Sequence, residues 1–267
     1  MNTDQTSNGV KNLLADAKNI CLIPSLKEPE SIVASLALFY TLKELQKNVN
    51  LVIDELPEKL NFLVPSLDFL ASPQNFVISI PKAVADVSQI YYEKGEESLK
   101  IHLTVNKGRV EKEKLSFYFQ NAKPDLVITV GIQNFQKELA SNLDAFGFLL
   151  DAPILNIDNQ PENQKFGKLN IVEEQALSET VFNIIQFINE SLVTKNVANC
   201  VLAGLMLYYE NFKSQRVTSA AFELTAQLMK KGAAYATIID NLKETTLNAK
   251  VQDVNVVAGE IINPILS

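Results

Sequence analysis

The sequence predicts an α/β fold: a mainly parallel, doubly wound sheet of about five strands with an inserted β-hairpin, followed by a helical C-terminal third. Short apolar runs of strand length alternate with stretches of helical periodicity over the first two thirds of the chain, which is typical of a parallel sheet with crossover helices. Two β-rich runs interrupt this alternation at about residues 87–105. The last third carries helical patterning only, so we expect helices packed on the sheet.

The first strand-helix-strand unit lies near the N-terminus. A short helix is predicted over residues 10–18, and the apolar run NICLIP at 19–24 predicts a buried strand. Apolar residues at helical spacing predict a helix over 31–46, and VNLVID at 49–54 predicts a second buried strand. Because two such strands joined by a helix lie parallel, this unit starts the sheet.

The middle of the chain supplies the other strands. FVISI at 76–80 predicts a further strand, and the runs at 87–105 are joined by a Lys-Gly-Glu-Glu turn, which predicts a hairpin. DLVITVG at 125–131 and ILNID at 154–158 are expected to complete the sheet, with a helix around 133–145 between them.

The C-terminal part is expected to be helical and to pack on the core. The predicted helices cover residues 176–192, 196–211, 218–231 and 233 to about 263. No linker rich in Pro, Gly or Ser separates the two parts, so we expect an α/β core over residues 1–190 and a helical part over 191–267 that form one body.

Composition excludes several classes of protein. The 267 residues include 24 basic and 31 acidic side chains, a net charge of −7 that disfavours a generally basic nucleic-acid coat, and no strong nucleic-acid signal is found. His102 is the single histidine, so a site built on several imidazoles is impossible. Cys21 and Cys200 lie in apolar runs and are expected to be buried thiols. Without a signal-peptide pattern or an apolar run of membrane-spanning length, we expect a cytoplasmic protein that does not enter a membrane.

Candidate site residues follow the predicted strands. Parallel sheets bind ligands at the carboxyl ends of their strands, so the loops there are where chemistry is expected. Glu28 and Glu30 lie in the loop after NICLIP, and Asp158, Asn159 and Gln160 end and follow ILNI. Each carboxylate also has a structural interpretation, because Glu28 and Glu30 precede a helix and Asp158 can cap the turn after its strand.

The order of these loops resembles the DHH phosphoesterase superfamily. The resemblance covers about residues 18–235, and its most specific stretch is NIDNQPENQKFGKLNIVEEQALSETVFNII, which has the shape of the family's NIDHHxxNxxFGxxN and AxS segment. It implies two divalent cations, usually manganese, that are held by Asp and His and deliver a hydroxide to phosphorus. We expect only the family's N-terminal domain here, because no glycine-rich substrate domain follows it.

Most positions of the family's metal ligands hold other residues in this chain. Pro24 stands for a histidine, Glu28 and Glu30 for two aspartates, Gly131 for an aspartate, Asn159 and Gln160 for the histidine pair, and Tyr208 for a later aspartate. Asp158 is retained. Only Glu28, Glu30 and Asp158 could therefore bind a cation, which is a weak set of ligands for two metal ions.

Three functions remain open at this point. The first is a degenerate DHH-like protein, without hydrolase activity or a cofactor, that acts in binding or assembly. The alternative is a manganese-dependent phosphodiesterase or phosphatase that acts on short oligonucleotides or nucleotides through Glu28, Glu30 and Asp158. The third is metal-free binding of a nucleotide-like small ligand in the same cleft.

A homodimer is also predicted. The stretch from residue 233 onwards carries more apolar residues than a terminal helix usually needs, and such surface usually finds a partner. These residues are Ala233, Ala236, Ile238, Ile239, Leu242, Val251, Val254, Val257, Ile261 and Ile262.

Overall fold

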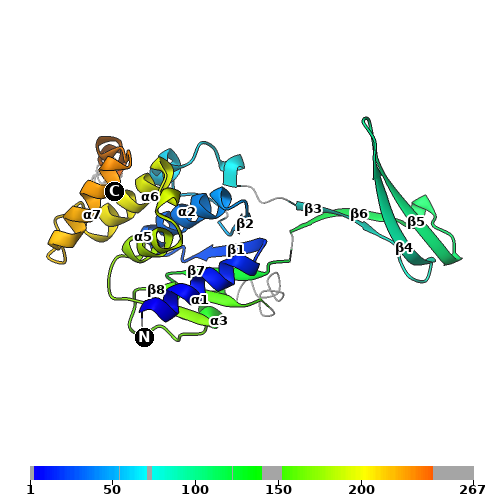
Figure 1. The fold of residues 1–267 in the computed structure, drawn as a ribbon, viewed down its shortest axis with the longest axis horizontal. Coiled ribbons are helices and arrows are strands. Elements are labelled where there is room, and N and C mark those ends of the chain that lie inside the picture. The colour runs from blue at the N-terminus through cyan, green and yellow to red at the C-terminus, as the bar shows by residue number, and fades with distance from the viewer. Residues whose placement is uncertain (1–2, 54, 71–73, 122, 140–151, 243–267) are drawn as a thin grey trace, which may run out of the picture. The chain divides into compact units, whose positions relative to one another are not determined.

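The chain forms two compact units in a computed structural model that describes residues 3–53, 55–70, 74–121, 123–139 and 152–242. Residues 1–72 and 123–267 make up the first, which we call the core unit, and residues 73–122 make up the second, the insert. Figure 1 labels their helices and strands. The expected boundary near residue 190 is of a different kind and stays a prediction.

A five-stranded parallel sheet lies at the centre of the core unit, in the order β2-β1-β7-β8-β9. Its strands are β1 (Asn19–Pro24), β2 (Asn48–Leu51), β7 (Leu126–Val130), β8 (Ile154–Asp158) and β9 (Leu169–Val172). The predicted parallel sheet is confirmed. Strand order reverses at β1, so the crevice between β1 and β7 is the place where sheets of this kind bind ligands.

One predicted strand belongs elsewhere, and one strand was missed. FVISI forms β3 (Gln74–Ser79), which pairs antiparallel with β6 (Ser116–Asn121) in the insert and not with the central sheet. The fifth strand of the sheet is β9, which is only four residues long and half-buried for most of its length. Such a short run carries too little periodicity to be recognised from sequence.

Alternating side chains of the strands pack on opposite faces of the sheet. Ile20 and Leu22 of β1 belong to the main apolar core, whereas Cys21 and Ile23 belong to a second apolar cluster with Phe135 of α3 (Phe135–Leu139). The predicted helix around 133–145 is α3 as far as residue 139, and residues 140–151 lie outside the described part.

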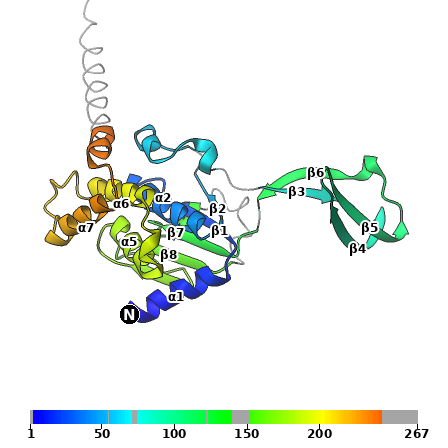
Figure 2. The same ribbon diagram turned by 45° about the horizontal axis from the view of Figure 1, so that its top comes forward.

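Two helices pack on the main face of the sheet, and a third packs on those two. They are α2 (Pro29–Glu44), α5 (Leu177–Ile188) and α6 (Lys195–Tyr208), which contact one another. They lie together in Figures 1 and 2. Residues 30–42 of α2 are buried almost without interruption, because α5 and α6 pack around this helix.

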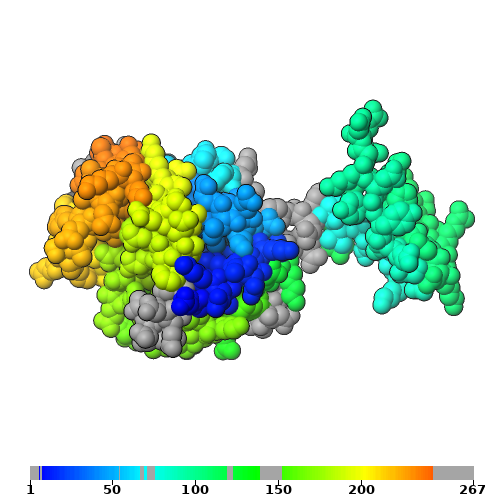
Figure 3. Space-filling model, viewed as in Figure 1, coloured from blue at the N-terminus to red at the C-terminus, as the bar shows by residue number. Residues whose placement is uncertain are grey.

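The helical C-terminal third is confirmed as far as residue 242. After α6 follow α7 (Ser219–Lys230) and a helical stretch over 235–242. The hydroxyl of Thr218 accepts a hydrogen bond from the backbone N–H of Ala221 at 3.3 Å and caps α7. At the other end of the chain, α1 (Thr3–Asp16) lies at the surface beside α5 (Figure 3).

The apolar residues that predicted a homodimer are partly covered where the structure describes them. Ala233, Ile238 and Leu242 are buried in the core of their own unit, and Ile239 packs against it, whereas Ala236 is exposed. Val251, Val254, Val257, Ile261 and Ile262 lie outside the described residues. The homodimer stays a prediction.

The insert contains the predicted hairpin. Strands β4 (Ala85–Lys94) and β5 (Leu99–Gly108) pair antiparallel and extend beyond the expected 87–105. Gly108 has a φ of +86°, and a Cβ on it would meet the carbonyl of Val84, so this turn requires glycine.

Both cysteines are buried and unpaired, as expected. Burial raises the pKa of the Cys21 thiol to about 12 and raises that of Cys200 as well, so neither is a ready nucleophile. Within the described part of the chain, none of the helices combines the length and the apolar character that a membrane crossing requires.

Gly204 marks the closest approach of α6 to α5. A Cβ at this position would lie 2.7 Å from the Cβ of Ser178. We expect Gly204→Ala to lower the free energy of unfolding by about 1–3 kcal/mol, measured by urea denaturation, because overpacking outweighs the gain in helix propensity. Adding Ser178→Gly should recover part of the loss.

Gly9 in α1 is the matched control. A Cβ there would meet only the flexible end of Leu169, at 3.1 Å. Gly9→Ala should keep or raise stability, and an equal loss in both variants would contradict this account of Gly204.

Candidate functional site

The candidate site lies at the carboxyl end of the parallel sheet. Pro24 at the end of β1 is in register with Val130 at the end of β7, and Val130 is in register with Ile157 of β8. The three loops that follow these strands therefore start side by side. They carry the predicted candidates Glu28 and Glu30, then Gly131, then Asp158, Asn159 and Gln160.

Asp158 is buried, with 1% of its surface exposed. Its Oδ1 accepts the backbone N–H of Asn159 at 2.8 Å, and its Oδ2 accepts a hydrogen bond from the Asn163 side chain at 2.7 Å. Desolvation raises the pKa of Asp158, these hydrogen bonds oppose the shift, and Glu138 adds to it. Both carboxylate oxygens thus have local partners, and the expected capping of the turn is confirmed.

Asn159 and Gln160, which stand where the family has its histidine pair, are bonded to each other. The Gln160 side-chain amide donates to the Oδ1 of Asn159 at 3.1 Å, and the Gln160 carbonyl accepts the backbone N–H of Asn163 at the same distance. Asn159 is buried. The pair shapes the turn and presents neutral amides.

Glu30 is buried and serves a helix far away in the sequence. Its Oε1 accepts the backbone N–H of Ser178, in the first turn of α5, at 3.1 Å. Desolvation by burial, with smaller contributions from the charges of Glu28 and Glu179, raises its pKa to about 8, although hydrogen bonds from the backbone of Ser178 and Leu177 oppose the shift. The sequence suggested that Glu30 interacts with the dipole of its own helix, α2. The backbone N–H that it binds belongs instead to the first turn of α5.

Glu28 is exposed at the N-cap position of α2, and its side chain makes no capping hydrogen bond. Partial desolvation is the largest cause that raises the pKa of Glu28, and the negative charges of Asp158 and Glu138 also raise it. Glu28, Asp158 and Glu138 are therefore close enough to repel one another.

Sequence reasoning missed Glu138. Its Oε1 accepts the backbone N–H groups of Gln133 and Asn134 at 2.9 and 3.2 Å, and its Oε2 lies 3.3 Å from the Nζ of Lys27. Nothing in its local sequence distinguishes it from a surface glutamate on a helix. Its position depends on the packing of two loops that are 111 residues apart.

Glu179 and Tyr209 extend the acidic region and were also missed. The Tyr209 hydroxyl lies 3.3 Å from both carboxylate oxygens of Glu179. Burial and this carboxylate raise the pKa of Tyr209 to about 12. Tyr208, which stands where the resemblance implies an aspartate, has its ring covered by the Arg216 guanidinium at 4.4 Å.

The space beside Gly131 is occupied. Gly131 has a φ of +70°, and a Cβ on it would lie 3.1 Å from the Oγ of Ser31 and 3.2 Å from the side chain of Leu177. The Ser31 hydroxyl accepts the N–H of Ser25 at 2.9 Å and donates to the carbonyl of Val130 at 2.6 Å. The chain around this position is thus arranged for glycine and not for the aspartate that the resemblance implies there.

Asn163 connects the residues of the site through hydrogen bonds. In the sequence it is the asparagine of NQKFG, within the segment that resembles the family. Its side-chain amide donates to Asp158 and to the carbonyl of Ile132, at 2.7 and 2.9 Å. Its Oδ1 accepts hydrogen bonds from Asn156 and from the backbone N–H of Lys165, at 2.8 and 2.7 Å.

These residues do not fit a pair of cations. Among the residues that the structure describes, no group of three or more His, Cys, Asp and Glu side chains is placed to hold a metal ion. Glu30 and Asp158 are engaged with N–H donors, and Glu28 is exposed. His102 belongs to β5 of the insert, where its ring stacks on Tyr91 at 4.6 Å.

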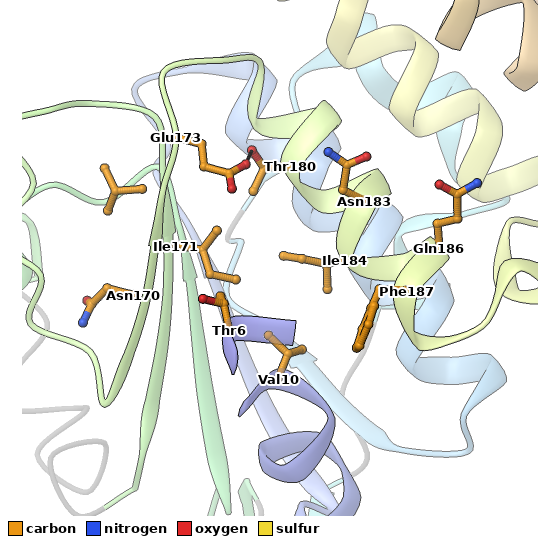
Figure 4. Close-up of a pocket in the computed structure, with 11 residues that line it drawn as sticks. Thr6, Val10, Asn170, Ile171, Glu173, Thr180, Asn183, Ile184, Gln186 and Phe187 are labelled. Carbon is orange, nitrogen blue, oxygen red and sulfur yellow. Dashed lines mark hydrogen bonds between the residues drawn. The ribbon is translucent and has the colours of Figure 1, made fainter. Parts of the chain in front are cut away.

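Two pockets border the helices behind this edge. One has a volume of about 630 Å³ and lies between α1, β9 and α5 (Figure 4). Thr180 bonds Glu173 at its rim, at 3.3 Å, and Ile171 and Phe187 supply apolar walls. The other, of about 620 Å³, is lined in part by Glu179, Tyr209 and Arg216, and so adjoins the acidic region.

Asn163 provides the first test of this site. We expect Asn163→Ala to lower the free energy of unfolding by about 2–4 kcal/mol, because it removes the donor to the buried Oδ2 of Asp158 and to the carbonyl of Ile132 and one of the two acceptors of the Asn156 amide. Chemical denaturation measures the change. Glu162→Ala at the exposed neighbouring position should stay within about 0.5 kcal/mol of the wild type, and similar losses in the two variants would show that Asn163 has no special role.

Glu30 predicts a pH dependence of stability. Because its pKa rises from 4.5 to about 8 on folding, the folded state binds the extra proton between these values, and the free energy of unfolding falls as pH rises from about 5 to 8. The loss has an upper limit of about 4–5 kcal/mol at about 1.4 kcal/mol per pKa unit.

Glu30→Gln keeps an acceptor for Ser178 and removes the titration. We expect this variant to be more stable than the wild type at pH 8 and to show a shallower pH slope in denaturation curves. Glu58→Gln, an exposed carboxylate, should leave the slope in place. An unchanged slope in Glu30→Gln would contradict the assignment.

Comparison with known proteins gives a likeness of fold and no likeness of sequence. No protein-family model matches the sequence, and no curated protein matches it. A solved structure described as an exopolyphosphatase-related protein from Bacteroides fragilis superposes with a TM-score of 0.62 at 15% identity, over 90% of this chain and 60% of that one. The chain thus spans 60% of the length of that protein, and the likeness establishes that the two share an α/β fold.

Proposed function

We propose that this chain is a DHH-like phosphoesterase-fold protein that has lost metal-dependent hydrolysis and acts by binding or assembly. The resemblance of the NIDNQPENQKFG segment and the fold shared with an exopolyphosphatase-related protein support the ancestry. The substitutions at the strand ends support the loss.

The state of Asp158 is the observation that carries this proposal. It is the position where the family's own ligand type is retained, yet both of its oxygens accept hydrogen bonds, from Asn159 and Asn163. A hydrolytic cation needs several ligands in fixed geometry to lower the pKa of bound water. Asp158 is one buried carboxylate held by these two donors, and it does not supply that set of ligands by itself.

Gly131 supports the same conclusion independently. If the family's aspartate had simply been deleted, a gap would be expected beside this residue. Instead Ser31 and Leu177 occupy the adjoining space, and Ser31 is bonded to both neighbouring strand ends. The carboxyl edge of the sheet is therefore close-packed around a glycine at position 131.

One observation favours the alternative of a manganese-dependent phosphodiesterase or phosphatase. Glu28 and Asp158 repel each other strongly enough to raise the pKa of Glu28, and a cation between them would relieve that repulsion. This arrangement supports at most one weakly held cation and not the two of the family mechanism.

The proposal is tested by incubating the protein with substrates of phosphoesterases. Short oligoribonucleotides, phosphoadenosine phosphate, cyclic di-adenylate and inorganic polyphosphate should survive incubation with the protein and excess manganese. Calorimetric titration with manganese should show no tight two-site binding. Turnover of about 1–10³ per second, the usual enzymatic range, would overturn the proposal.

Asp158→Asn is the matched control, because it keeps the size and an acceptor while removing the charge. Trace hydrolysis that is equal in the wild type and in Asp158→Asn comes from elsewhere in the preparation. Hydrolysis that disappears in this variant would establish the rearranged carboxylate site.

A further inference from the structure

The central sheet ends in an open edge at β9. This strand pairs with β8 and has no second neighbour among the described strands. The backbone N–H of Glu173 donates to the carbonyl of Asp158, so the backbone groups of Ile171, two positions earlier, also point towards β8. The N–H and C=O groups of Asn170 and Val172 therefore point away from β8, and no described backbone group bonds them.

The pocket of about 630 Å³ runs along this edge (Figure 4). Ile171 packs on the face of the sheet that the helices cover, and alternation places the side chains of Asn170 and Val172 on the opposite face. The pocket is lined by all three, so it follows the backbone edge between the two faces. Its apolar walls also include Val10, Ile184 and Phe187. Unpaired backbone groups beside an apolar wall are what an added strand binds.

A row of polar side chains crosses the sheet towards the same edge. Thr129 of β7, Asn156 of β8 and Asn170 of β9 are in register. The Thr129 hydroxyl donates to the Oδ1 of Asn156 at 3.0 Å, and the Asn156 amide donates to the Oδ1 of Asn170 at 3.1 Å. The two asparagines hold the same place in matching sequences, LNID in β8 and LNIV in β9. A further strand of this row would carry an asparagine between two apolar residues.

The C-terminal segment contains such a sequence. Residues 254–257 read VNVV, which matches LNIV of β9 position by position. Valine on both sides of the asparagine suits a strand, because β-branched side chains favour extended backbone. The order alone also occurs in helix α5, as FNII at 182–185, so it identifies this segment only together with its charges and its reach.

The charges match a parallel pairing in this register. With Asn255 opposite Asn170, Asp253 lies opposite Lys168, the residue before β9. Lys168 is exposed and forms no ion pair with any residue that the structure describes. Opposite charges on neighbouring strands attract, whereas an antiparallel strand with the same asparagine pair would bring Asp253 beside Glu173. The sequence around VNVV therefore favours the parallel direction.

The segment is long enough to reach the edge. Leu242, the last described residue, is buried in the same unit as β9, and residues 243–253 lie between it and VNVV. A chain of that length spans up to about 40 Å when extended, which is comparable to the diameter of a domain of this size. In the parallel register Val256 lies opposite Ile171, on the side of the apolar walls, and Asn255 continues the polar row.

We infer that residues 254–257 of the chain's own C-terminal segment pair with β9 as a sixth, parallel strand, with Asn255 opposite Asn170. The pairing gives partners to the outward backbone groups of Asn170 and Val172 and places apolar side chains in the pocket. It also covers an edge that is otherwise open to other chains. The helix expected from 233 to about 263 would then end before residue 254. This inference is independent of the proposed loss of hydrolysis.

Hydrogen exchange of the full chain tests the pairing. The N–H groups of Asn170 and Val172 should be protected, although no described residue bonds them. Val256→Asp should speed their exchange at least about tenfold, because it places a charge against the apolar walls. Ile261→Asp, in the same segment but outside VNVV, is the matched control and should leave their exchange unchanged. The N–H groups of β1 should stay protected in both variants, which shows that the core unit is folded.

Cross-linking tests the register. Val172→Cys with Val257→Cys places two thiols opposite each other, and a short bismaleimide should join them within one chain, because Cys21 and Cys200 are buried. Val172→Cys with Asp253→Cys is the matched control, since these positions face each other only in the antiparallel arrangement. In the parallel one they lie roughly 13 Å apart along the strand, beyond the reach of that reagent.

Unprotected N–H groups of Asn170 and Val172 in the full chain would overturn the inference, and so would protection that survives Val256→Asp. A cross-linked product of twice the chain mass of 29.6 kDa would show that the strand comes from a second copy and would overturn pairing within one chain. Cross-linking through Asp253→Cys would overturn the parallel direction.

Discussion

The candidate site depends on the side-chain amide of Asn163. Four hydrogen bonds from this one group reach Asp158 and Asn156 of β8, the carbonyl of Ile132 after β7, and Lys165 in its own loop. In a buried setting an amide with all its groups satisfied favours one conformation over its competitors, because any alternative leaves polar atoms without partners. Asp158 is tolerated at the end of its strand because Asn163 stands beside it. The position of the most critical carboxylate is therefore set by a neutral neighbour.

Neutral donors take the place that cations would occupy in a phosphoesterase site. Glu30 receives the N–H of Ser178, Asp158 receives the amide of Asn163, and Glu138 receives two backbone N–H groups and an ion pair with Lys27. These donors compensate part of the desolvation that raises the pKa of Glu30 and Asp158. A metal would compensate more and would hold the carboxylates as ligands. Each carboxylate oxygen can accept more than one contact, so it is the small number of carboxylates at this edge, together with their hydrogen bonds, that links its structure to its chemistry.

The sequence predicted the sheet well and the site in part, for a physical reason. Strands such as β1, β7 and β8 are buried on both faces, so their apolar runs are visible locally. The partner of Glu30 lies 148 residues away, and Glu138 meets Lys27 across 111 residues, so neither contact leaves a local pattern. FVISI shows the converse limit, because an apolar run identifies a strand without identifying its sheet. Asn163 was visible only as part of a longer segment.

The insert and the cleft are connected through the topology of the sheet. β1 pairs with both β2 and β7, and the chain between β2 and β7 must cross β1 before it re-enters the sheet. The insert lies within that crossing, so it adds residues without interrupting any pair of neighbouring strands. The alternation of β4 and β5 has the same period that made the hairpin recognisable, and that alternation also assigns its apolar residues to one face. Whether these apolar residues are buried depends on what packs against them, which the alternation alone does not specify. Residues can therefore be added in this crossing while Asn163 and the strand ends around it keep their arrangement.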